Sequence, residues 1–404
     1  MPLSIEFGKK FKTIGFDLNS KRINELNKKI DRTGEVDDKE FDASTNIEFT
    51  NKKNDLEKVQ IFIVTVPTPI DNNKKPNLDP LKSATSIIAE YLKVGDIVIY
   101  ESTVYPGCTE EVCVPILEKI SNLKYNKDFY CGYSPERINP GDKNNKLSNI
   151  KKVTSGSNEK IGREIDLLYS KIIKAGTYLV SSIKVAEAAK VIENSQRDIN
   201  IAFVNELAKI FNLMDINTHD VLDAAGTKWN FLNFKPGLVG GHCIGVDPYY
   251  LAEKAMELGY NPEIILAGRR MNDSMGEYVA SEVIKCMRTK NININGSSVL
   301  ILGITFKENC PDIRNTKVVD LISSLNDYGV NITIYDPWAN EEEVMKEYAL
   351  ESSNSLPKEK FDSIVLTVSH REFKDLDFSL LKKENAIIYD VKNSLNRSSK
   401  DKTL

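Results

Sequence analysis

The loop that contains Cys243 combines a thiol with an unusually bare backbone. It runs Gly237-Leu-Val-Gly-Gly-His-Cys-Ile-Gly-Val-Asp-Pro248, so Asp247 follows the cysteine by four residues. Glycines without side chains let a ligand approach the backbone closely. A thiol in such a loop can be a nucleophile if it is accessible and its thiolate is stabilised. The alternative for any single cysteine is a small buried hydrophobic residue.

Two further groups of residues have side chains that suit chemistry. Lys190 and Asn194 are four residues apart in a helical pattern, so they share one helix face. A cation and an amide donor on one face can stabilise an oxyanion, although the same pair also suits an exposed helix surface. Glu136 follows a strand-to-loop transition, which is where α/β sheets bind their ligands.

The elements that must position these residues alternate between strands and helices in the N-terminal third. Such alternation predicts a parallel α/β sheet. We expect strands at 11–16, 59–66, 96–100 and 129–133, and helices at 20–30, 81–92 and 109–120.

The middle of the chain is helical. A pattern without glycine or proline runs from about 183 to 214, and helices of this length commonly bridge domains or form a dimer interface. Further helices are predicted at 219–225, 249–258 and 264–288. The apolar stripe of the long helix consists of Val185, Ala189, Ile192, Ile199, Phe203, Leu207 and Ile210.

A second α/β unit follows a linker at 291–296. Its predicted strands are 298–304, 330–335, 361–369 and 386–390, with a helix at 315–328, and the polar tail after Ser394 is expected to fray. The segment that ends at Asp336 echoes the one that ends at Asp17, which is a weak internal repeat. We therefore predict an α/β fold with two Rossmann-like domains, 1–182 and 291–404, joined by a long central helix in a helical domain at 183–290.

Composition excludes several classes of protein. The 404 residues carry a net charge of −4, which argues against a nucleic-acid binder. No apolar run approaches the roughly 20 residues of a membrane span, and no leader peptide is recognisable. Six scattered cysteines and three histidines make a metal site improbable and indicate reduced thiols in the cytoplasm.

Together the motifs resemble those of the UDP-glucose/GDP-mannose dehydrogenases over essentially the whole chain. This family oxidises the C6 alcohol of a sugar nucleotide to a carboxylate with two NAD⁺. The motifs are the Cys243 loop and Val66-Pro-Thr-Pro69, Glu101-Ser-Thr-Val104, Ser134-Pro-Glu-Arg-Ile-Asn-Pro-Gly-Asp142, Ala188-Ala-Lys-Val-Ile-Glu-Asn194 and Thr305-Phe-Lys-Glu308.

The resemblance implies a role for each catalytic residue. Cys243 corresponds to the catalytic thiol, Lys190 and Asn194 to the oxyanion stabilisers, and Asp247 to the residue that orients Lys190 and water. Glu136 resembles the base for thioester hydrolysis. Thr103 resembles the hydroxyl near the nicotinamide and the catalytic water.

It also implies the binding residues. Asp17 matches the acidic residue that binds the adenosine ribose diol and would repel a 2′-phosphate, so NAD is favoured over NADP. The other cofactor-binding positions are Arg22, Val66, Pro67, Thr68, Thr103, Glu136 and Arg314. Lys235, Lys307 and Arg314 match family positions that contact nucleotide phosphates or couple the two sites. The substrate-binding positions are Lys190, Asn194, Lys235, Gly240, Gly241, Arg269 and Lys307.

Two departures narrow the expected substrate. Pro140 stands where UDP-glucose enzymes often have a second Glu, and Gly-His-Cys replaces Gly-Ser-Cys. Both resemble the branch that acts on UDP-N-acetylhexosamines, so UDP-N-acetylglucosamine or UDP-N-acetylgalactosamine is expected, in a homodimer that feeds capsule or other surface polysaccharide. UDP-glucose and UDP-N-acetylmannosamine remain alternatives, as does a non-catalytic UDP-sugar-binding paralogue. A 3-hydroxyacid-type dehydrogenase would not explain Cys243.

A third departure lies at the N-terminus. The chain begins at the helix that follows the family's first strand and its GxGxxG turn. Without that central strand, two strand edges should be unpaired and NAD should bind weakly. The absence of the strand and the turn fits a start placed too late, a truncation or a degenerate paralogue.

Overall fold

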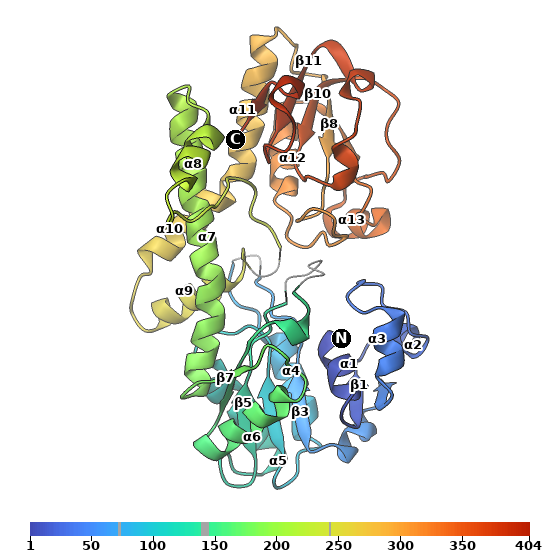
Figure 1. The fold of residues 1–404 in the computed structure, drawn as a ribbon, viewed down its shortest axis with the longest axis vertical. Helices are drawn as coiled ribbons and strands as arrows, with labels where there is room; N and C mark the ends of the chain where they lie inside the picture. Colours follow the sequence, from blue (N-terminus) through green and yellow to red (C-terminus); the bar gives the residue numbers. More distant parts are fainter. Residues whose placement is uncertain (72–73, 139–144, 242–243) are drawn as a thin grey trace. The chain divides into compact units, whose positions relative to one another are not determined.

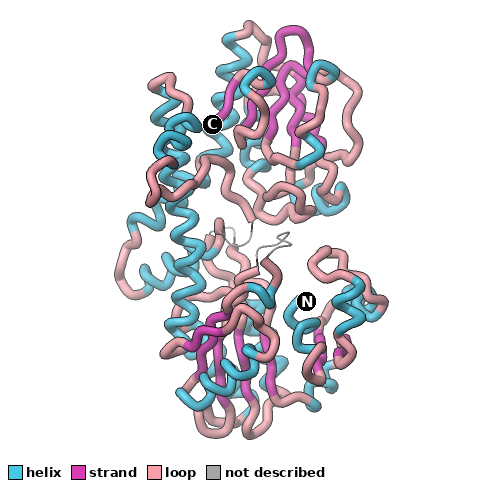
Figure 2. The backbone as a smooth tube through the Cα atoms, viewed as in Figure 1, coloured by secondary structure: helices cyan, strands magenta, loops and turns pink. Residues whose placement is uncertain are grey.

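The structure is a computed structural model that describes residues 1–71, 74–138, 145–241 and 244–404. The chain forms two compact units (Figure 1). Each unit has its own cluster of buried hydrophobic residues. Unit 1 contains residues 1–193 and 249–260, and unit 2 contains residues 194–248 and 261–404. Helices and strands alternate along most of both units (Figure 2), which confirms the predicted α/β class.

The main sheet of unit 1 has the strand order β3-β4-β5-β6-β7 among the described residues, and all its pairs are parallel except β5 with β6. Strand β4, which lies between β3 and β5, is buried throughout, which explains its continuous apolar sequence. The strands are β3 (Ile61–Val64), β4 (Ile97–Tyr100), β5 (Tyr130–Tyr133), β6 (Lys152–Gly156) and β7 (Thr177–Leu179).

The N-terminal segment forms a separate parallel sheet, β1 (Thr13–Phe16) with β2 (Ile47–Thr50). Within the described residues, β1 pairs with β2 and β3 pairs with β4, so each keeps one unpaired edge. This confirms the predicted pair of free strand edges. The helices of unit 1 are α1 (Pro2–Gly8), α2 (Ser20–Asn27), α3 (Asp38–Ala43), α4 (Asp79–Ala89), α5 (Val114–Ser121) and α6 (Glu159–Ser170), with short helical turns at Lys53–Lys58 (η1), Thr109–Cys113 (η2) and Leu147–Asn149 (η3).

Some features of unit 1 differ from the sequence prediction. The helix expected at 109–120 begins with a π-helical turn, η2, before α5. Pro115 has no backbone N–H to continue the α-helical pattern, which accounts for the change. Sequence patterns also missed β2, β6, β7, α3 and α6.

The predicted long helix is present as α7 (Ile183–Leu213), which passes from unit 1 into unit 2. The single helix expected at 264–288 was wrong, because α10 (Glu263–Asp273) and α11 (Met275–Thr289) are separated at Ser274. The Ser274 hydroxyl donates to the Met271 carbonyl at 2.8 Å, a local bond that competes with regular helix geometry. The other helices of the middle region are α8 (Thr218–Gly226) and α9 (Asp247–Glu257).

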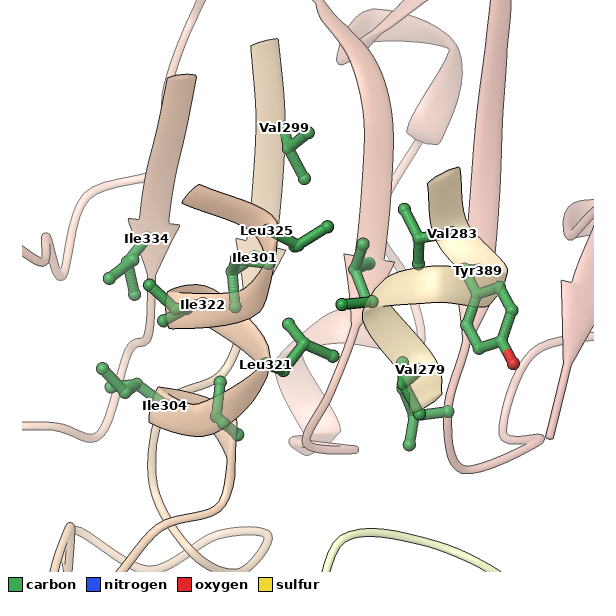
Figure 3. Packing of buried hydrophobic residues seen from close by; sticks show 14 of the residues in the cluster. Val279, Val283, Val299, Ile301, Ile304, Leu321, Ile322, Leu325, Ile334 and Tyr389 are labelled. Carbon is green, nitrogen blue, oxygen red and sulfur yellow. The ribbon is translucent and has the colours of Figure 1, made fainter. Parts of the chain in front are cut away.

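Unit 2 is built on a parallel sheet of order β12-β11-β10-β8-β9 within the described residues. Figure 3 shows its core, where Val279 and Val283 of α11 and Leu321 and Leu325 of α12 pack with buried strand residues. The elements are β8 (Ser298–Leu302), α12 (Val318–Asp327), β9 (Asn331–Tyr335), α13 (Glu341–Tyr348), β10 (Phe361–Leu366), β11 (Lys382–Asp390) and β12 (Lys402–Thr403), with short turns at Arg371–Phe373 (η4), Phe378–Leu380 (η5) and Arg397–Ser399 (η6).

The expectation that the tail after Ser394 frays was wrong. β12 pairs in parallel with β11, and Leu404 is buried in the core of unit 2. Asp401 also accepts a hydrogen bond from the Ile388 backbone at 2.7 Å. Polar composition alone predicted disorder, but these tertiary contacts anchor the segment.

Candidate active site

The loops after β3, β4 and β5 carry several of the predicted residues of unit 1. These strands are parallel, so their carboxyl ends lie at one edge of the sheet. The Ser102 hydroxyl donates to the Val66 carbonyl at 2.6 Å and ties the second loop to the first. Pro67 is exposed, whereas Thr68 and Thr103 are half-buried.

Glu136, the predicted base, is held by its neighbours. Its Oε1 accepts hydrogen bonds from the backbone N–H groups of Arg137 and Ile138, at 2.5 and 2.6 Å. Its Oε2 lies 3.8 Å from Nζ of Lys152, and 38% of the side chain is exposed. A solvent-accessible carboxylate with a fixed orientation suits a base that acts on water. Pro140, in the same motif, lies outside the described residues.

Behind Glu136 lies a buried ionisable group that sequence reasoning missed. Lys152 at the start of β6 donates to Glu101 at 2.7 Å, and the Tyr169 hydroxyl donates to the same carboxylate. Burial raises the pKa of Glu101, although Lys152 acts in the opposite direction. Burial also raises the pKa of Tyr169, and the nearby charge of Glu101 adds to that effect. No sequence pattern signals that this lysine would be buried inside a sheet.

The N-terminal part of α7 carries Lys190, which is 7% exposed. One turn earlier, Glu187 accepts hydrogen bonds from the backbone N–H groups of Gly107 and Thr109, at 2.5 and 2.9 Å. Burial raises the pKa of Glu187 to about 7, against the lowering effect of the bonds from Thr109 and Gly107. Glu187 therefore fastens the loop that carries Thr103 to the helix that carries Lys190, a second contact that the sequence did not predict.

In unit 2 the structure brings Asn194 and Asp247 together. The Asn194 side-chain amide donates to Asp247 at 2.5 Å, and the two residues are 6% and 1% exposed. A buried amide and carboxylate in direct contact hold each other in one orientation. The predicted nucleophile Cys243 lies outside the described residues.

The glycines of the Cys243 loop serve packing. A Cβ on Gly240 would lie 2.7 Å from the Asn315 carbonyl oxygen. Gly241 has a φ of +84°, and a Cβ there would lie 2.9 Å from the Phe306 ring. The start of the loop is fixed by Asn205 of α7, which exchanges two hydrogen bonds with the Gly237 backbone, at 2.8 and 3.1 Å.

Three of the predicted arginines have acidic partners inside their own unit. Arg269 is 2% exposed and contacts Asp198 at 2.5 Å and Asp273 at 2.6 Å. The corresponding partners of Arg22 and Arg314 are Asp31 at 2.6 Å and Asp312 at 2.5 Å. Arg22 and Arg269 are mostly buried, whereas the side chain of Arg314 is 57% exposed.

A cavity in unit 2 opens beside the end of β8 and the start of α12. Lys392, which the sequence analysis did not select, lines it, and burial lowers the pKa of this lysine. Of the predicted lysines of unit 2, Lys307 is half-buried and Lys235 is exposed. A lysine beside a helix start suits an anionic group. The lining residues are Leu238, Gly240, Thr305, Phe306, Glu308, Thr316, Lys317, Val318, Thr367, Val368 and Lys392.

The two acidic residues of the internal repeat differ in their surroundings. Asp17 after β1 is exposed, and one carboxylate oxygen accepts from the Asn19 backbone at 2.8 Å. Asp336 after β9 is buried and accepts from the backbone of Ile304 at 2.6 Å and of Trp338 at 2.8 Å. An exposed carboxylate at this strand end can accept hydrogen bonds from a ribose diol, which is the role predicted for Asp17.

These features define a class: a dehydrogenase built from two Rossmann-like units with a helical connection. The family models agree. Residues 2–173 match the NAD binding domain, 184–274 the central domain and 300–397 the UDP binding domain of the UDP-glucose/GDP-mannose dehydrogenase family.

Individual dehydrogenases are also similar to this chain over nearly its whole length. A UDP-N-acetyl-D-glucosamine 6-dehydrogenase of Pseudomonas aeruginosa is 56% identical, over 99% of this chain and 96% of that protein. One of Salmonella typhi is 54% identical, over 99% and 95%. The solved structure of a UDP-D-ManNAc dehydrogenase from Pyrococcus horikoshii superimposes with a TM-score of 0.88 at 27% identity, covering 98% of this chain and 93% of that one.

The chain belongs to the UDP-glucose/GDP-mannose dehydrogenase family, as its motifs predicted. Its cofactor is NAD, the ligand of the domain that residues 2–173 match. None of the helices that the structure describes is long and apolar enough to cross a membrane.

Proposed function

We propose that the chain oxidises the C6 alcohol of a UDP-N-acetylhexosamine, UDP-GlcNAc or UDP-GalNAc, to the uronate for surface polysaccharide synthesis. The observation that carries the proposal is the buried contact of Asn194 with Asp247, two residues whose motifs belong to this chemistry. The 54–56% identity to two UDP-N-acetyl-D-glucosamine 6-dehydrogenases supports the substrate class. In this scheme residues 1–182 bind NAD, 183–290 carry the reacting thiol and 291–404 bind UDP.

The first half of the reaction is assigned to residues that stabilise negative charge. Two NAD⁺ molecules, bound one after the other, would each accept one hydride. Lys190 and Asn194 stabilise the C6 alkoxide as it forms, because a cation and an amide N–H lower the energy of an oxyanion. Asp247 keeps the Asn194 amide in place through its 2.5 Å contact. Cys243 then adds to the aldehyde and gives a thiohemiacetal, which is oxidised to a thioester.

The second half is hydrolysis. Glu136 takes a proton from water, and Thr103 and Asp247 help to place that water at the thioester carbonyl. The orientation of Glu136 is supported by the hydrogen bonds to its Oε1 from the Arg137 and Ile138 backbone. The UDP part of the substrate is assigned to unit 2, where Lys392 lines the cavity. The sequence prediction adds Lys307, Lys235 and Arg269 to this assignment.

The experiment that tests the proposal measures NADH formed per sugar consumed. We expect two NADH per uronate with UDP-GlcNAc or UDP-GalNAc, and slower turnover with UDP-glucose and UDP-ManNAc. Binding of UDP-sugar without any NADH would favour the non-catalytic paralogue. Faster turnover with UDP-ManNAc would favour the activity named for the Pyrococcus horikoshii protein.

We further propose a cytoplasmic homodimer. The five described cysteines are free thiols, as expected in a reducing compartment. Along α7, Val185, Ile192, Phe203 and Ile210 are 43–55% exposed in the single chain. A contiguous apolar stripe on a long helix is suited to pairing with a second copy.

A further inference from the structure

The buried group formed by Lys152, Glu101 and Tyr169, here called the Lys152 cluster, has no part in the chemistry assigned so far. The three residues are at most 2% exposed. The lysine lies 2.7 Å from Glu101, and its Nζ is 5.5 Å from the centre of the Tyr169 ring. Burying an ion pair is costly in free energy compared with packing apolar side chains of similar size. Stability alone is therefore a poor explanation of the cluster, and a functional role is a better one.

Its position suggests that purpose. The Lys152 ammonium lies between two carboxylates, 2.7 Å from Glu101 and 3.8 Å from Glu136. Glu101 is two residues before Thr103 in the loop after β4, and Glu136 is in the loop after β5. One ammonium group therefore joins the two loops that carry the residues assigned to thioester hydrolysis.

Two other cationic groups lie near Glu136, but within the described residues only Lys152 lies within 4 Å of both carboxylates. Burial lowers the pKa of the Met1 α-amino group, and the negative charges of Asp31, Glu136 and Glu101 act in the opposite direction. Arg137 is directed elsewhere, to the Lys151 carbonyl at 2.9 Å and to Glu193 of α7. Lys152 is the cation whose distances to both carboxylates define a bridge.

We propose that Lys152, held by Glu101 and Tyr169, is a positioning residue for thioester hydrolysis and leaves both hydride transfers unaffected. This rests on the proposed function of Glu136. In the step, the water oxygen forms a bond to the thioester carbonyl carbon and the C–S bond breaks. One water proton passes to Glu136 and then to the departing thiolate. No electrons are transferred.

The decisive variant removes both buried charges. Lys152→Met alone leaves Glu101 buried without its cation, so Glu101→Gln/Lys152→Met is the better-folded test. Lys151→Met is the matched control, because this neighbouring lysine is exposed. In rapid mixing with UDP-GlcNAc and NAD⁺, we expect the double variant to give a burst of NADH followed by turnover at least about 10-fold slower.

The stalled intermediate provides a second readout. Intact mass spectrometry of the double variant should detect the sugar nucleotide attached to the protein, while Lys151→Met should resemble the parent chain. Lys152→Arg, which restores the charge, should recover part of the steady-state rate. Equal slowing of burst and steady state, with no adduct, would overturn the proposal.

Glu136→Gln separates this inference from the proposed function. If Glu136→Gln gives no burst and no adduct, the assignment of Glu136 as the base fails and the inference falls with it. If Glu136→Gln stalls as a thioester but the cluster variant does not, the inference alone fails. Adding Lys152→Met to Glu136→Gln should slow hydrolysis no further, because both act on one step.

If the parent chain forms no NADH, urea unfolding tests the contact itself. Lys152→Met and Glu136→Gln, singly and together, form a double-mutant cycle. Unfolding midpoints that combine non-additively support the bridge, since residues in contact show coupling. Strictly additive midpoints overturn it.

Discussion

Single ionisable side chains determine much of the candidate site, and several of them are buried. Glu187 and Lys152 contact loops that carry assigned residues, and Lys392 lines a cavity together with Gly240. The sequence indicated the residues with motif positions but not these three. An isolated Glu or Lys in a helical or strand pattern has the same appearance whether its surroundings are water or protein, because tertiary contacts decide its burial.

Replacing Lys190 tests the oxyanion role at this scale. Lys190→Ala should lower kcat by at least about 10²-fold, the effect of removing one oxyanion donor. Lys190→Arg should also be poor, because a planar guanidinium does not place a point charge at the same position. Steady-state NADH assays measure both. Near-parental activity of Lys190→Arg would contradict the assignment.

Replacing Cys243 tests the covalent step. Cys243→Ser should lose nearly all turnover and keep its affinity for the UDP-sugar, because the thiohemiacetal requires the thiol while recognition of UDP does not. Calorimetric titration and the NADH assay give the two quantities. Cys310→Ser is a control in the same unit, at a buried position in the loop after β8. A fully active Cys243→Ser enzyme would end the covalent scheme.

Glu187 predicts a pH effect on folding. Its folded pKa of about 7 lies above the 4.5 of an ordinary glutamate, so the folded chain binds this proton more tightly than the unfolded chain. The stabilisation is complete below about pH 4.5 and is lost as the pH rises through 7, by roughly 3 kcal/mol at most.

Urea unfolding at pH 5 and pH 8 checks this sign. The free energy of unfolding of the parent chain, relative to that of Glu187→Gln, should be smaller at pH 8. Exposed Glu159 provides the matched control, Glu159→Gln, for which we expect no such trend. A relative stability that rises with pH would contradict the buried, protonated state of Glu187.

At the scale of elements, α7 and the central strands were predictable because their patterns are long and strongly apolar. The helix expected at 183–214 is α7, at Ile183–Leu213, and the strand expected at 96–100 is β4. The strand β12 was not predictable, because its pairing with β11 forms only in the folded chain. At Ser274 a local bond to the Met271 carbonyl combines with a tertiary bond from Lys209 of α7, at 2.8 Å, and only the local bond lies within reach of a sequence pattern. The other predicted helices and strands differ from the observed ones by a few residues at their ends.

The exposed apolar stripe on α7 is the proposed dimer interface, and a charge placed in it tests the proposal. Phe203→Glu should shift the proposed dimer toward monomer, because it places a charge in the middle of an apolar interface. Leu167→Glu on α6 is the control, since Leu167 is also largely exposed, at 61%, but belongs to a different helix. Analytical ultracentrifugation measures the mass. A Phe203→Glu protein with the same mass as the parent would exclude this stripe as the interface.

At the scale of the whole molecule, the chain consists of two units with separate cores and different assigned ligands. The three domains predicted from the sequence, 1–182, 183–290 and 291–404, stay a prediction beside this division. Both tryptophans, Trp229 and Trp338, belong to unit 2. Fluorescence therefore follows the unfolding of unit 2, and circular dichroism follows both units.

This separation allows ligand binding to be assigned to a unit in the intact chain. UDP at 100 times its dissociation constant should stabilise the unit that binds it by about 2.7 kcal/mol and raise the fluorescence transition by roughly 5 °C or more. Trp338 reports this change, because its indole donates to Glu372 at 3.0 Å and stacks on buried His370. Trp229→Phe removes the exposed second probe and should leave the transition unchanged.

NAD⁺, assigned to unit 1, should move the circular dichroism curve without moving the fluorescence. A fluorescence shift caused by NAD⁺ but not by UDP would reverse the assignment of the two units.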